Sequence, residues 1–443
     1  MHPLRVFLDN LHYSFDIILR IFLILTGISA FFFVFIAIII GLAQKKQSNG
    51  EISVKEIDLP TVSVQIPTYN ELAALQCAKS CVDFEYPADK LQIIIGDDSS
   101  DTEISKQIDE FVRQYSPKVI VTRRGTNMGY KPGNLNHMLK FSTGEIIVIF
   151  DSDFLPKRNF LTEIIKSFIL NPEIAAVQAR WSIKNFERSF SSLWGGTIAY
   201  YTHYVLLPFV QILGGNCFLC GSAEAIRKSI LMEIGPWSEN ALTEDIEYTL
   251  RLMKHNKKIF FLPQLKCEGE APFTLRDLCK QQMRWAFGNI SAFKNHFRSI
   301  ISGKKESRVS SRDRRSILIF LASYILSIFV FFSTIFGLLV LFTINPNGIT
   351  INWDFVLSPS LLNIIILASL IGGWTISLLL SKNSRSIFKV IISMFTIGLV
   401  IPCFIVIGVT KALFGGKMKW YMVRKGGNDF SPAVIGTSST TSS

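Results

Sequence analysis

Three apolar runs in the first part of the chain are each followed closely by acidic residues. Runs 62–66, 91–96 and 146–150 lead into Glu71, into Asp97 with Asp98, and into Asp151 with Asp153. A single acidic strand end is typical of a helix cap or a turn. Three such ends at one rim would repel one another unless a cation lies among them. Hard cations prefer carboxylate oxygens, and Mg²⁺ is commonly shared with substrate phosphates, so the pattern predicts a divalent metal beside a diphosphate.

Basic residues surround the start of the next helical pattern. Arg123 and Arg124 follow a further apolar run, 119–122, and Lys131 opens the helical segment after it. Lys131 could contact a diphosphate, or it could be an ordinary solvated lysine. The chain has neither the P-loop lysine motif nor the Rossmann glycine fingerprint, which argues against a kinase-like or dinucleotide site.

Two later segments combine carboxylates, an amide, a guanidinium and an indole. Thr243 is the expected N-cap of an amphipathic run that starts with Glu244, Asp245 and Glu247. Acidic residues at a helix start also complement the helix dipole, and the residues alone leave these three tied as a general base. The segment Gln281-x-x-Arg284-Trp285, taken alone, would be typical of an interfacial amphipathic helix.

These side chains must be positioned by the elements between residues 60 and 300. Buried-type strand patterns alternate there with helical patterns, which predicts a mostly parallel α/β sheet. Ligands of such sheets bind beyond the carboxyl ends of the strands, and the acidic segments fall at those ends.

The composition points to a membrane protein with a large aqueous part. Of 443 residues 49% are hydrophobic and 18% charged, below the roughly 25% charged residues of soluble proteins. Four apolar runs are long enough to span a bilayer: 21–43, 317–344, 361–380 and 390–410. We therefore expect an N-terminal membrane region (1–50), an aqueous domain with interfacial helices (51–300), a C-terminal membrane region (301–414) and a tail (415–443).

The charges flanking these runs suggest an orientation. Lys45 and Lys46 follow the first run and place the aqueous domain in the cytoplasm by the positive-inside rule. One crossing before the domain and three after it would place the tail on the opposite side of the membrane from the domain. The tail is basic, however, which favours the cytoplasmic side, so one element must be irregular. Either the last run, interrupted by Pro402, is re-entrant, or an element at residues 6–13 lies on the membrane.

Taken in order, the motifs resemble those of the family-2 inverting glycosyltransferases, specifically the membrane-embedded processive synthases of cellulose, chitin, hyaluronan and mannan. The matching set is Asp97/Asp98, Asp151-x-Asp153, Thr243-Glu244-Asp245 and Gln281-x-x-Arg284-Trp285, together with Phe218-Leu219-Cys220-Gly221-Ser222-Ala223 and Val177-Gln178-Ala179-Arg180-Trp181. The resemblance covers about residues 60–300 and implies a GT-A-like fold. Pro132 and Val423 depart from it, where many relatives have alanine and threonine.

The resemblance implies a role for each matching position. Asp97 and Asp98 would hold the nucleotide base and ribose, close to Thr68, Tyr69 and Glu71. Asp151 would support the nucleotide, and Arg284 would lie near the diphosphate, which Lys131 could also contact. Asp153 would ligate Mg²⁺ or Mn²⁺. Asp245 would be the general base, with Glu244 beside it in the catalytic motif. The acceptor would be bound by Cys220, Gly221, Ser222, Gln281 and Trp285, and a gating-like segment would include Trp420 and Lys425.

We therefore expect an enzyme of the plasma membrane, with a cytoplasmic catalytic domain, that extends a β-linked polysaccharide from a nucleotide-sugar and translocates the product. A UDP-sugar is the favoured donor, with GDP-mannose as the alternative. Two other interpretations are a non-processive enzyme that adds one sugar to a lipid such as ceramide or diacylglycerol, and an inactive scaffold or channel subunit. No nucleic-acid partner is expected, because the net charge of +12 comes without a zinc-finger spacing or an RNA-binding aromatic motif.

Overall fold

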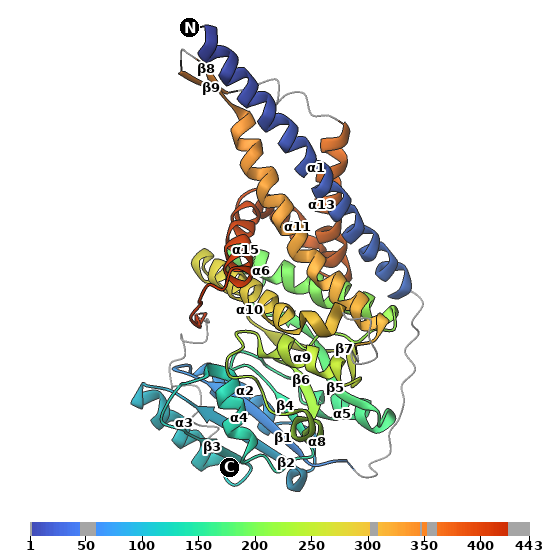
Figure 1. The fold of residues 1–443 in the computed structure, drawn as a ribbon. Helices are drawn as coiled ribbons and strands as arrows, with labels where there is room; N and C mark the ends of the chain where they lie inside the picture. The colour runs from blue at the N-terminus through green and yellow to red at the C-terminus, as the bar shows by residue number, and fades with distance from the viewer. Residues whose placement is uncertain (1, 45–58, 302–308, 346–347, 352–360, 424–443) are drawn as a thin grey trace, which may run out of the picture.

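The fold was analysed in a computed structural model that describes residues 2–44, 59–301, 309–345, 348–351 and 361–423. A domain of strands and helices lies at one end of the molecule, and a column of long helices rises from it (Figure 1). A helical layer separates the two parts.

A seven-stranded sheet forms the centre of the aqueous domain, in the order β3-β2-β1-β4-β6-β5-β7. Its strands are β1 (Val62–Thr68), β2 (Leu91–Asp97), β3 (Val119–Thr122), β4 (Ile146–Ile149), β5 (Ile174–Ile183), β6 (Glu224–Arg227) and β7 (Lys258–Gly269). Strands β1 to β4 are mutually parallel and β5 is parallel to β7, whereas β6 runs antiparallel between β4 and β5. Every residue of β1 and β4 is buried, as expected for strands covered on both faces. The predicted mostly parallel α/β sheet is confirmed.

Helices cover both faces of this sheet. One face carries α2 (Ala73–Val82), α3 (Thr102–Tyr115) and α5 (Phe160–Leu170), and the other carries α4 (Tyr130–Leu139), α8 (Lys228–Ile234) and α9 (Glu244–Lys254). In α3 the apolar residues recur at helical spacing and turn one stripe toward the sheet. Both faces are therefore filled, and the carboxyl ends of β1, β2 and β4 are left open at one rim.

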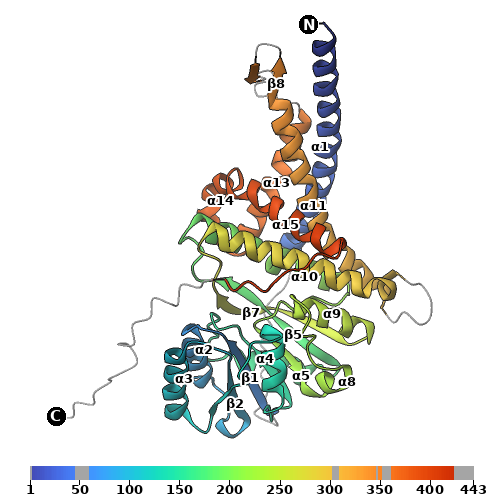
Figure 2. The ribbon, with the colours of Figure 1, turned by 60° about the vertical axis from the view of Figure 1, so that its left-hand side comes forward.

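A helical layer connects the sheet domain to the column. It contains α6 (Phe190–Tyr201), a π-helical turn (Thr202–Leu206), α7 (Leu207–Ile212) and the long helix α10 (Leu275–Ile301). Helix α10 runs across the base of the column (Figure 2). One apolar cluster joins α6 and α10 to the C-terminal helices, so the two parts share a core.

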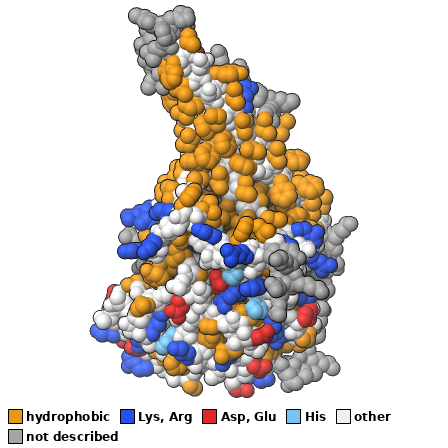
Figure 3. Space-filling model, in the orientation of Figure 1, with side chains coloured by type: hydrophobic (Ala, Val, Ile, Leu, Met, Phe, Trp, Pro, Cys, Tyr) orange, Lys and Arg blue, Asp and Glu red, His pale blue; other side chains and the backbone are white. Residues whose placement is uncertain are grey.

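Three helices of the column are long and apolar enough to cross a membrane: α1 (His2–Gln44), α11 (Ser311–Leu341) and α13 (Leu361–Leu380). Helix α1 packs against α11 and α13, and Phe22 stacks on Phe332 with 4.8 Å between ring centroids. Apolar side chains cover the outside of the column, and basic side chains gather at its base (Figure 3). A lipid-facing surface bordered by cations is typical of a membrane region.

The structure corrects two boundaries of the predicted spans. The first helix is continuous from residue 2, so residues 6–13 belong to it and form no separate surface element. The second helix ends at Leu341, where β8 (Phe342–Asn345) begins a hairpin with β9 (Gly348–Ile351).

The last apolar run is a bent pair of helices, as the re-entrant alternative allows. Helices α14 (Ile387–Met394) and α15 (Ile397–Leu413) meet at 65°. The break lies at residues 395–396, whereas Pro402 sits inside α15. With the bent pair counted as one span, the described residues hold up to four membrane-spanning segments.

Gly408 generates a prediction about how α15 is held to α10. A Cβ atom at Gly408 would lie 2.4 Å from the backbone oxygen of Met283, whereas a Cβ at Gly41 in α1 would meet nothing within 4 Å. Gly408→Ala should therefore lower the stability of the detergent-solubilised protein by about 1–3 kcal/mol, the usual cost of overpacking. Gly41→Ala is the matched control and should be neutral or slightly stabilising, because alanine favours helix over glycine. Thermal unfolding of both variants checks this, and equal melting temperatures would contradict the close helix contact.

Candidate active site

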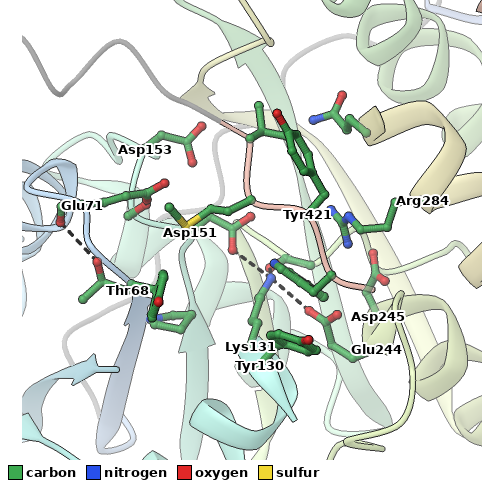
Figure 4. Close-up of a pocket in the computed structure, with 18 of the residues that line it drawn as sticks. Thr68, Glu71, Tyr130, Lys131, Asp151, Asp153, Glu244, Asp245, Arg284 and Tyr421 are labelled. Atoms are coloured by element: carbon green, nitrogen blue, oxygen red, sulfur yellow. Dashed lines mark hydrogen bonds and ion pairs between the residues drawn. The ribbon is translucent and has the colours of Figure 1, made fainter. Parts of the chain in front are cut away.

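A cavity of about 350 Å³ opens at the rim where the acidic strand ends meet (Figure 4). Its walls come from the ends of β1, β2 and β4, the starts of α4 and α9, helix α10 and the C-terminal segment. The predicted site residues that line it are Thr68, Tyr69, Glu71, Asp98, Lys131, Asp151, Asp153, Cys220, Gly221, Glu244, Asp245, Gln281, Arg284, Trp285 and Trp420. Asp97 and Ser222 are buried and are not among the lining residues, and Lys425 lies outside the described residues.

Lys131 lies at the centre of the cavity floor and joins three parts of the site. Its Nζ is 2.8 Å from Asp151 Oδ1 and 3.0 Å from Glu244 Oε1, and it donates a hydrogen bond to the carbonyl oxygen of Gly221 at 2.5 Å. The ammonium is largely buried, and although burial opposes its charge, the two carboxylates raise the pKa of Lys131 above its ordinary value. Lys131 is therefore a fixed cation of the site and not a solvated surface lysine.

The turn at Gly221 needs a residue without a side chain. Gly221 has φ of +83°, in the left-handed region that favours glycine. A Cβ there would also lie 3.1 Å from Lys131 Nζ and 3.4 Å from Asp245 Oδ2. The close approach lets the backbone of the turn reach between the lysine and the carboxylate.

Glu244 and Asp245 open α9 and point in different directions, with Glu244 toward Lys131 and Asp245 on the side of Arg284 (Figure 4). Burial raises the pKa of Asp245 to about 7, with a further contribution from the negative charge of Glu244 that Lys131 partly offsets. A carboxylate with a pKa near neutrality can both accept and release a proton at physiological pH.

Thr243 occupies the predicted N-cap position of α9, but its hydroxyl makes no capping hydrogen bond. A Cβ at Gly288 of α10 would come within 2.6–2.7 Å of the Thr243 side chain, so that side chain is packed against α10. The buried hydroxyl has no hydrogen-bond partner among the described residues.

The two aspartates at the end of β2 behave differently. Asp98 lines the cavity and is held by Arg124 in a two-point ion pair, at 2.9 Å and 2.6 Å. Asp97 turns away to Arg123 at 2.8 Å and to Ser105 at 2.7 Å. Asp97 therefore supports the wall behind the cavity.

The donor set near β4 fits a divalent cation that is shared with a substrate. Asp151 and Asp153 follow β4, and Glu71 lies across from them (Figure 4). Asp153 also accepts a hydrogen bond from the backbone N–H of Glu270 at 3.1 Å. No group of three His, Cys, Asp or Glu side chains within the described ranges is arranged to hold a metal alone. Mg²⁺ is usually bound by one or two carboxylates, and substrate phosphates complete its coordination.

Helix α10 lines the opposite wall with Gln281, Arg284 and Trp285. The Arg284 side chain is half-buried, and its guanidinium donates to the carbonyl of Leu242 at 2.8 Å. Trp181, at the end of β5, faces the same space. The motif around Trp181 contributed to the family resemblance, but no site role was predicted for it.

Contacts on several sides fix Trp181, including an edge contact with Phe154 at 5.1 Å between ring centroids. Its Nε1 donates to the carbonyl of Ser222 at 3.0 Å, and its ring stacks on His203 with 4.8 Å between centroids. Burial, with a smaller contribution from the nearby Arg180, lowers the pKa of His203 to about 3, so the imidazole is neutral. The indole is thus held rigidly at the cavity, and Ser222 acts behind the wall as its support.

The C-terminal segment covers the cavity. The Trp420 ring lies between Tyr130, at 5.6 Å between centroids, and the Arg284 guanidinium, at 4.3 Å. The Tyr421 hydroxyl donates to Asp277 at 2.6 Å. Tyr130 had no predicted role, because only the fold brings it onto the same cavity as the C-terminal segment, whereas Tyr421 belongs to the predicted gating-like segment that begins at Trp420.

A second cavity of about 360 Å³ leads from the first into the helical column. It lies between α1, α6, α10, α11, α13 and α15 and is lined mainly by apolar and aromatic side chains, including Trp194 and Trp374. Five residues line both cavities, and we call them the junction: Trp181, Cys220, Thr243, Asp245 and Trp285.

Known proteins share this sequence and fold. The family described as glycosyltransferase-like family 2 matches residues 60–288. The chain is 31% identical over 261 residues to glucomannan 4-beta-mannosyltransferase 2 of Arabidopsis thaliana, covering 56% of this chain and 48% of that protein. It is also 31% identical over 280 residues to the UDP-forming cellulose synthase catalytic subunit of Pseudomonas fluorescens, covering 60% and 36%. The matched region thus spans half or less of the length of these relatives.

The fold resembles a solved structure over most of the chain. A mannosyltransferase of Pyrobaculum calidifontis in complex with GDP-Man and Mn²⁺ aligns with a TM-score of 0.60 at 16% identity, over 90% of this chain and 100% of that one. The GT-A-like fold predicted from the ordered motifs is therefore confirmed. Because the family match covers more than half of the sequence, the chain belongs to glycosyltransferase family 2.

Proposed function

We propose that the protein transfers a sugar from a nucleotide-sugar to the end of a β-linked polysaccharide, with inversion at the anomeric carbon, and passes the product into its membrane region. The junction carries this proposal. It sets the half-buried carboxylate of Asp245 between a polar cavity suited to a nucleotide diphosphate and a mainly apolar cavity that enters the helical column.

Asp245 is suited to act as the general base. A sugar hydroxyl is a poor nucleophile, so a carboxylate must take its proton as it attacks the anomeric carbon. Trp181 and Trp285 flank Asp245 at the junction and offer apolar ring faces to a pyranose. In a single displacement, an α-linked donor then gives a β-linked product.

The donor is proposed to lie along the acidic rim, with its base near Asp98 and Tyr69 and its diphosphate near Lys131 and Arg284. Cations beside the departing diphosphate stabilise the charge that develops on it. Asp153 would ligate Mg²⁺ or Mn²⁺, which when bound would neutralise the same charge. GDP-Man and Mn²⁺ in the similar structure support a nucleotide-sugar donor with a divalent metal, and the relatives named as a mannosyltransferase and a UDP-forming synthase support the nucleotide-sugar donor. That the enzyme prefers a UDP-sugar to GDP-mannose stays a prediction.

The second cavity favours a sugar chain over a lipid acceptor. Asn289 is buried there, and its side-chain nitrogen donates to the Tyr324 hydroxyl while its oxygen has no partner among the described residues. An unpaired buried amide costs about 1–3 kcal/mol unless a ligand satisfies it, and sugar hydroxyls can do so whereas an acyl chain cannot. Four tryptophans along the path support the same choice: Trp181, Trp194, Trp285 and Trp374.

The alternative is transfer of one sugar to a membrane lipid, which the largely apolar lining of the second cavity would also accept. The membrane orientation is proposed to be that of a cytoplasmic catalytic domain, because nucleotide-sugars are supplied there and basic side chains gather at the base of the column.

The donor and the product can be identified together. Purified protein in lipid nanodiscs should release nucleotide from one of UDP-glucose, UDP-N-acetylglucosamine and GDP-mannose. Gel electrophoresis of the labelled product should show chains that lengthen with time and stay out of organic solvent. A single labelled species that partitions with lipid would replace the polysaccharide proposal with the lipid alternative. Absence of nucleotide release from all three donors would contradict the proposed activity itself.

Turnover should require a divalent metal. EDTA should abolish nucleotide release, and Mg²⁺ or Mn²⁺ should restore it, because the acidic rim needs a cation to bind a diphosphate. Asp153→Ala should weaken donor affinity and rate by at least about 10–100-fold, since that much is already lost when a residue that only supports a metal ligand is removed. Asp83→Ala is the control, since Asp83 pairs with Lys79 away from the cavity. Full activity in chelator would disprove the metal assignment.

Asp245→Asn should keep nucleotide binding but lose turnover by roughly 10²–10⁴-fold, the usual contribution of a general base. The base must be deprotonated, so wild-type kcat/KM should rise as the pH increases through about 7, the pKa of Asp245. Glu247→Gln is the control, because Glu247 binds Arg251 and His296 outside the cavity. Calorimetry with the nucleotide, beside pH-dependent transfer rates, checks both statements. If Asp245→Asn stays within a few-fold of wild type while Glu244→Gln is inactive, the base is Glu244.

A further inference from the structure

Glu224 is a buried side chain that takes no part in the transfer reaction proposed above. It begins β6, opposite Gln178 of β5 and Ile149 of β4, and its exposed fraction is 1%. Buried glutamates are rare unless they are paired or hydrogen-bonded, because desolvation penalises the charge. The contacts of Glu224 therefore indicate what it does.

Its hydrogen bonds all lead to one turn. Oε2 of Glu224 accepts the backbone N–H of Gly221 at 2.9 Å and that of Cys220 at 3.2 Å. Gln178 Oε1, from the neighbouring strand, accepts the same Cys220 N–H at 2.7 Å. Two buried side chains thus accept hydrogen bonds from the backbone of this turn, and of the two only Glu224 accepts the N–H of Gly221.

The turn that Glu224 holds also positions Lys131. The Gly221 carbonyl accepts from Lys131 Nζ, which also bridges Asp151 and Glu244. A continuous set of contacts therefore runs from Glu224 through the Gly221 peptide to the cation of the site. A shift of that peptide would move the ammonium relative to both carboxylates.

An amide could hold the turn at a smaller desolvation cost, as Gln178 does for Cys220. When it is deprotonated, Glu224 also adds a negative charge close to the site, where it is attracted by Lys131 and repelled by Asp245 and Glu244. Burial, followed by the charge of Asp245, raises the pKa of Glu224 to about 8. Asp245, whose charge acts on Glu224, also interacts electrostatically with three further titratable groups: Arg284 from α10, Tyr324 from α11 and Cys220 from the turn.

We infer that Glu224 is a positioning residue of the transfer reaction. Its carboxylate fixes the Cys220–Gly221 turn so that the Gly221 carbonyl holds Lys131 between Asp151 and Glu244. The inference rests on the proposed function only for its effect on turnover, since the linkage itself is a property of the fold.

A double-mutant cycle tests the linkage. Glu224→Leu removes the acceptor of the Gly221 N–H, whereas Glu224→Gln keeps an oxygen there and removes the charge. Lys131→Met removes the cation. Gln178→Leu is the matched control, because it loosens the same turn from the other strand without releasing the Gly221 N–H.

Glu224→Leu should lower kcat about tenfold per folded protein, the effect of losing one buried hydrogen-bond acceptor, and Glu224→Gln should recover most of that loss. In the Lys131→Met background, Glu224→Leu should cause less than a further twofold loss, because coupled residues are not additive. Gln178→Leu should remain additive with Lys131→Met. In the pH profile, wild type should show a second inflection near 8 that Glu224→Gln lacks, while the inflection near 7 persists.

Three results would overturn the inference: full activity of Glu224→Leu, additive losses of Glu224→Leu and Lys131→Met, or equal coupling for Gln178→Leu. The same cycle measured by thermal unfolding needs no turnover and should show the same non-additivity. If Glu224→Leu and Lys131→Met are coupled in stability but no nucleotide is released, the linkage is supported and the proposed activity is rejected. Nucleotide release without coupling in either measurement would reject the role of Glu224 and keep the activity.

Discussion

The site depends on one buried cation. Lys131 reaches Asp151 at the end of β4, Glu244 at the start of α9 and the backbone carbonyl of Gly221. A buried charge is tolerated only when opposite charges and hydrogen bonds surround it, and breaking such a set typically costs 3–5 kcal/mol. The three partners come from segments that are distant in sequence, so the requirement to satisfy this ammonium draws the donor side and the acceptor side of the site together.

The connection between the site and the membrane region follows from helix α10. Gln281, Arg284 and Trp285 face the polar cavity, and Gln282, Trp285 and Asn289 face the cavity inside the column. One helix therefore lines both spaces, and α15 packs along it with Gly408 against its backbone. Helix α15 is therefore in direct contact with the helix that carries Gln281, Arg284 and Trp285.

Sequence alone was enough for the sheet, the family and most of the cavity lining, because these depend on local patterns: apolar strands, acidic strand ends and motifs in a set order. It was insufficient where partners lie far apart in the chain. Nothing local distinguishes Asp97 from Asp98, and only the fold shows that Arg123 turns Asp97 away from the cavity. Trp181, Tyr130 and Glu224 were missed as site residues for the same reason. The first helix was predicted too short because residues 2–20 are less uniformly apolar than the run that follows them.

The most direct test of the account is a structure of the protein in nanodiscs with Mn²⁺ and a non-hydrolysable nucleotide-sugar. The nucleobase of the donor should lie beside Asp98, its diphosphate between Asp153 and Lys131, and its anomeric carbon should face the junction, with Asp245 on the acceptor side. A donor bound elsewhere, or one whose anomeric carbon faces away from Asp245 and Trp285, would contradict the claim that the junction is where the sugar is transferred.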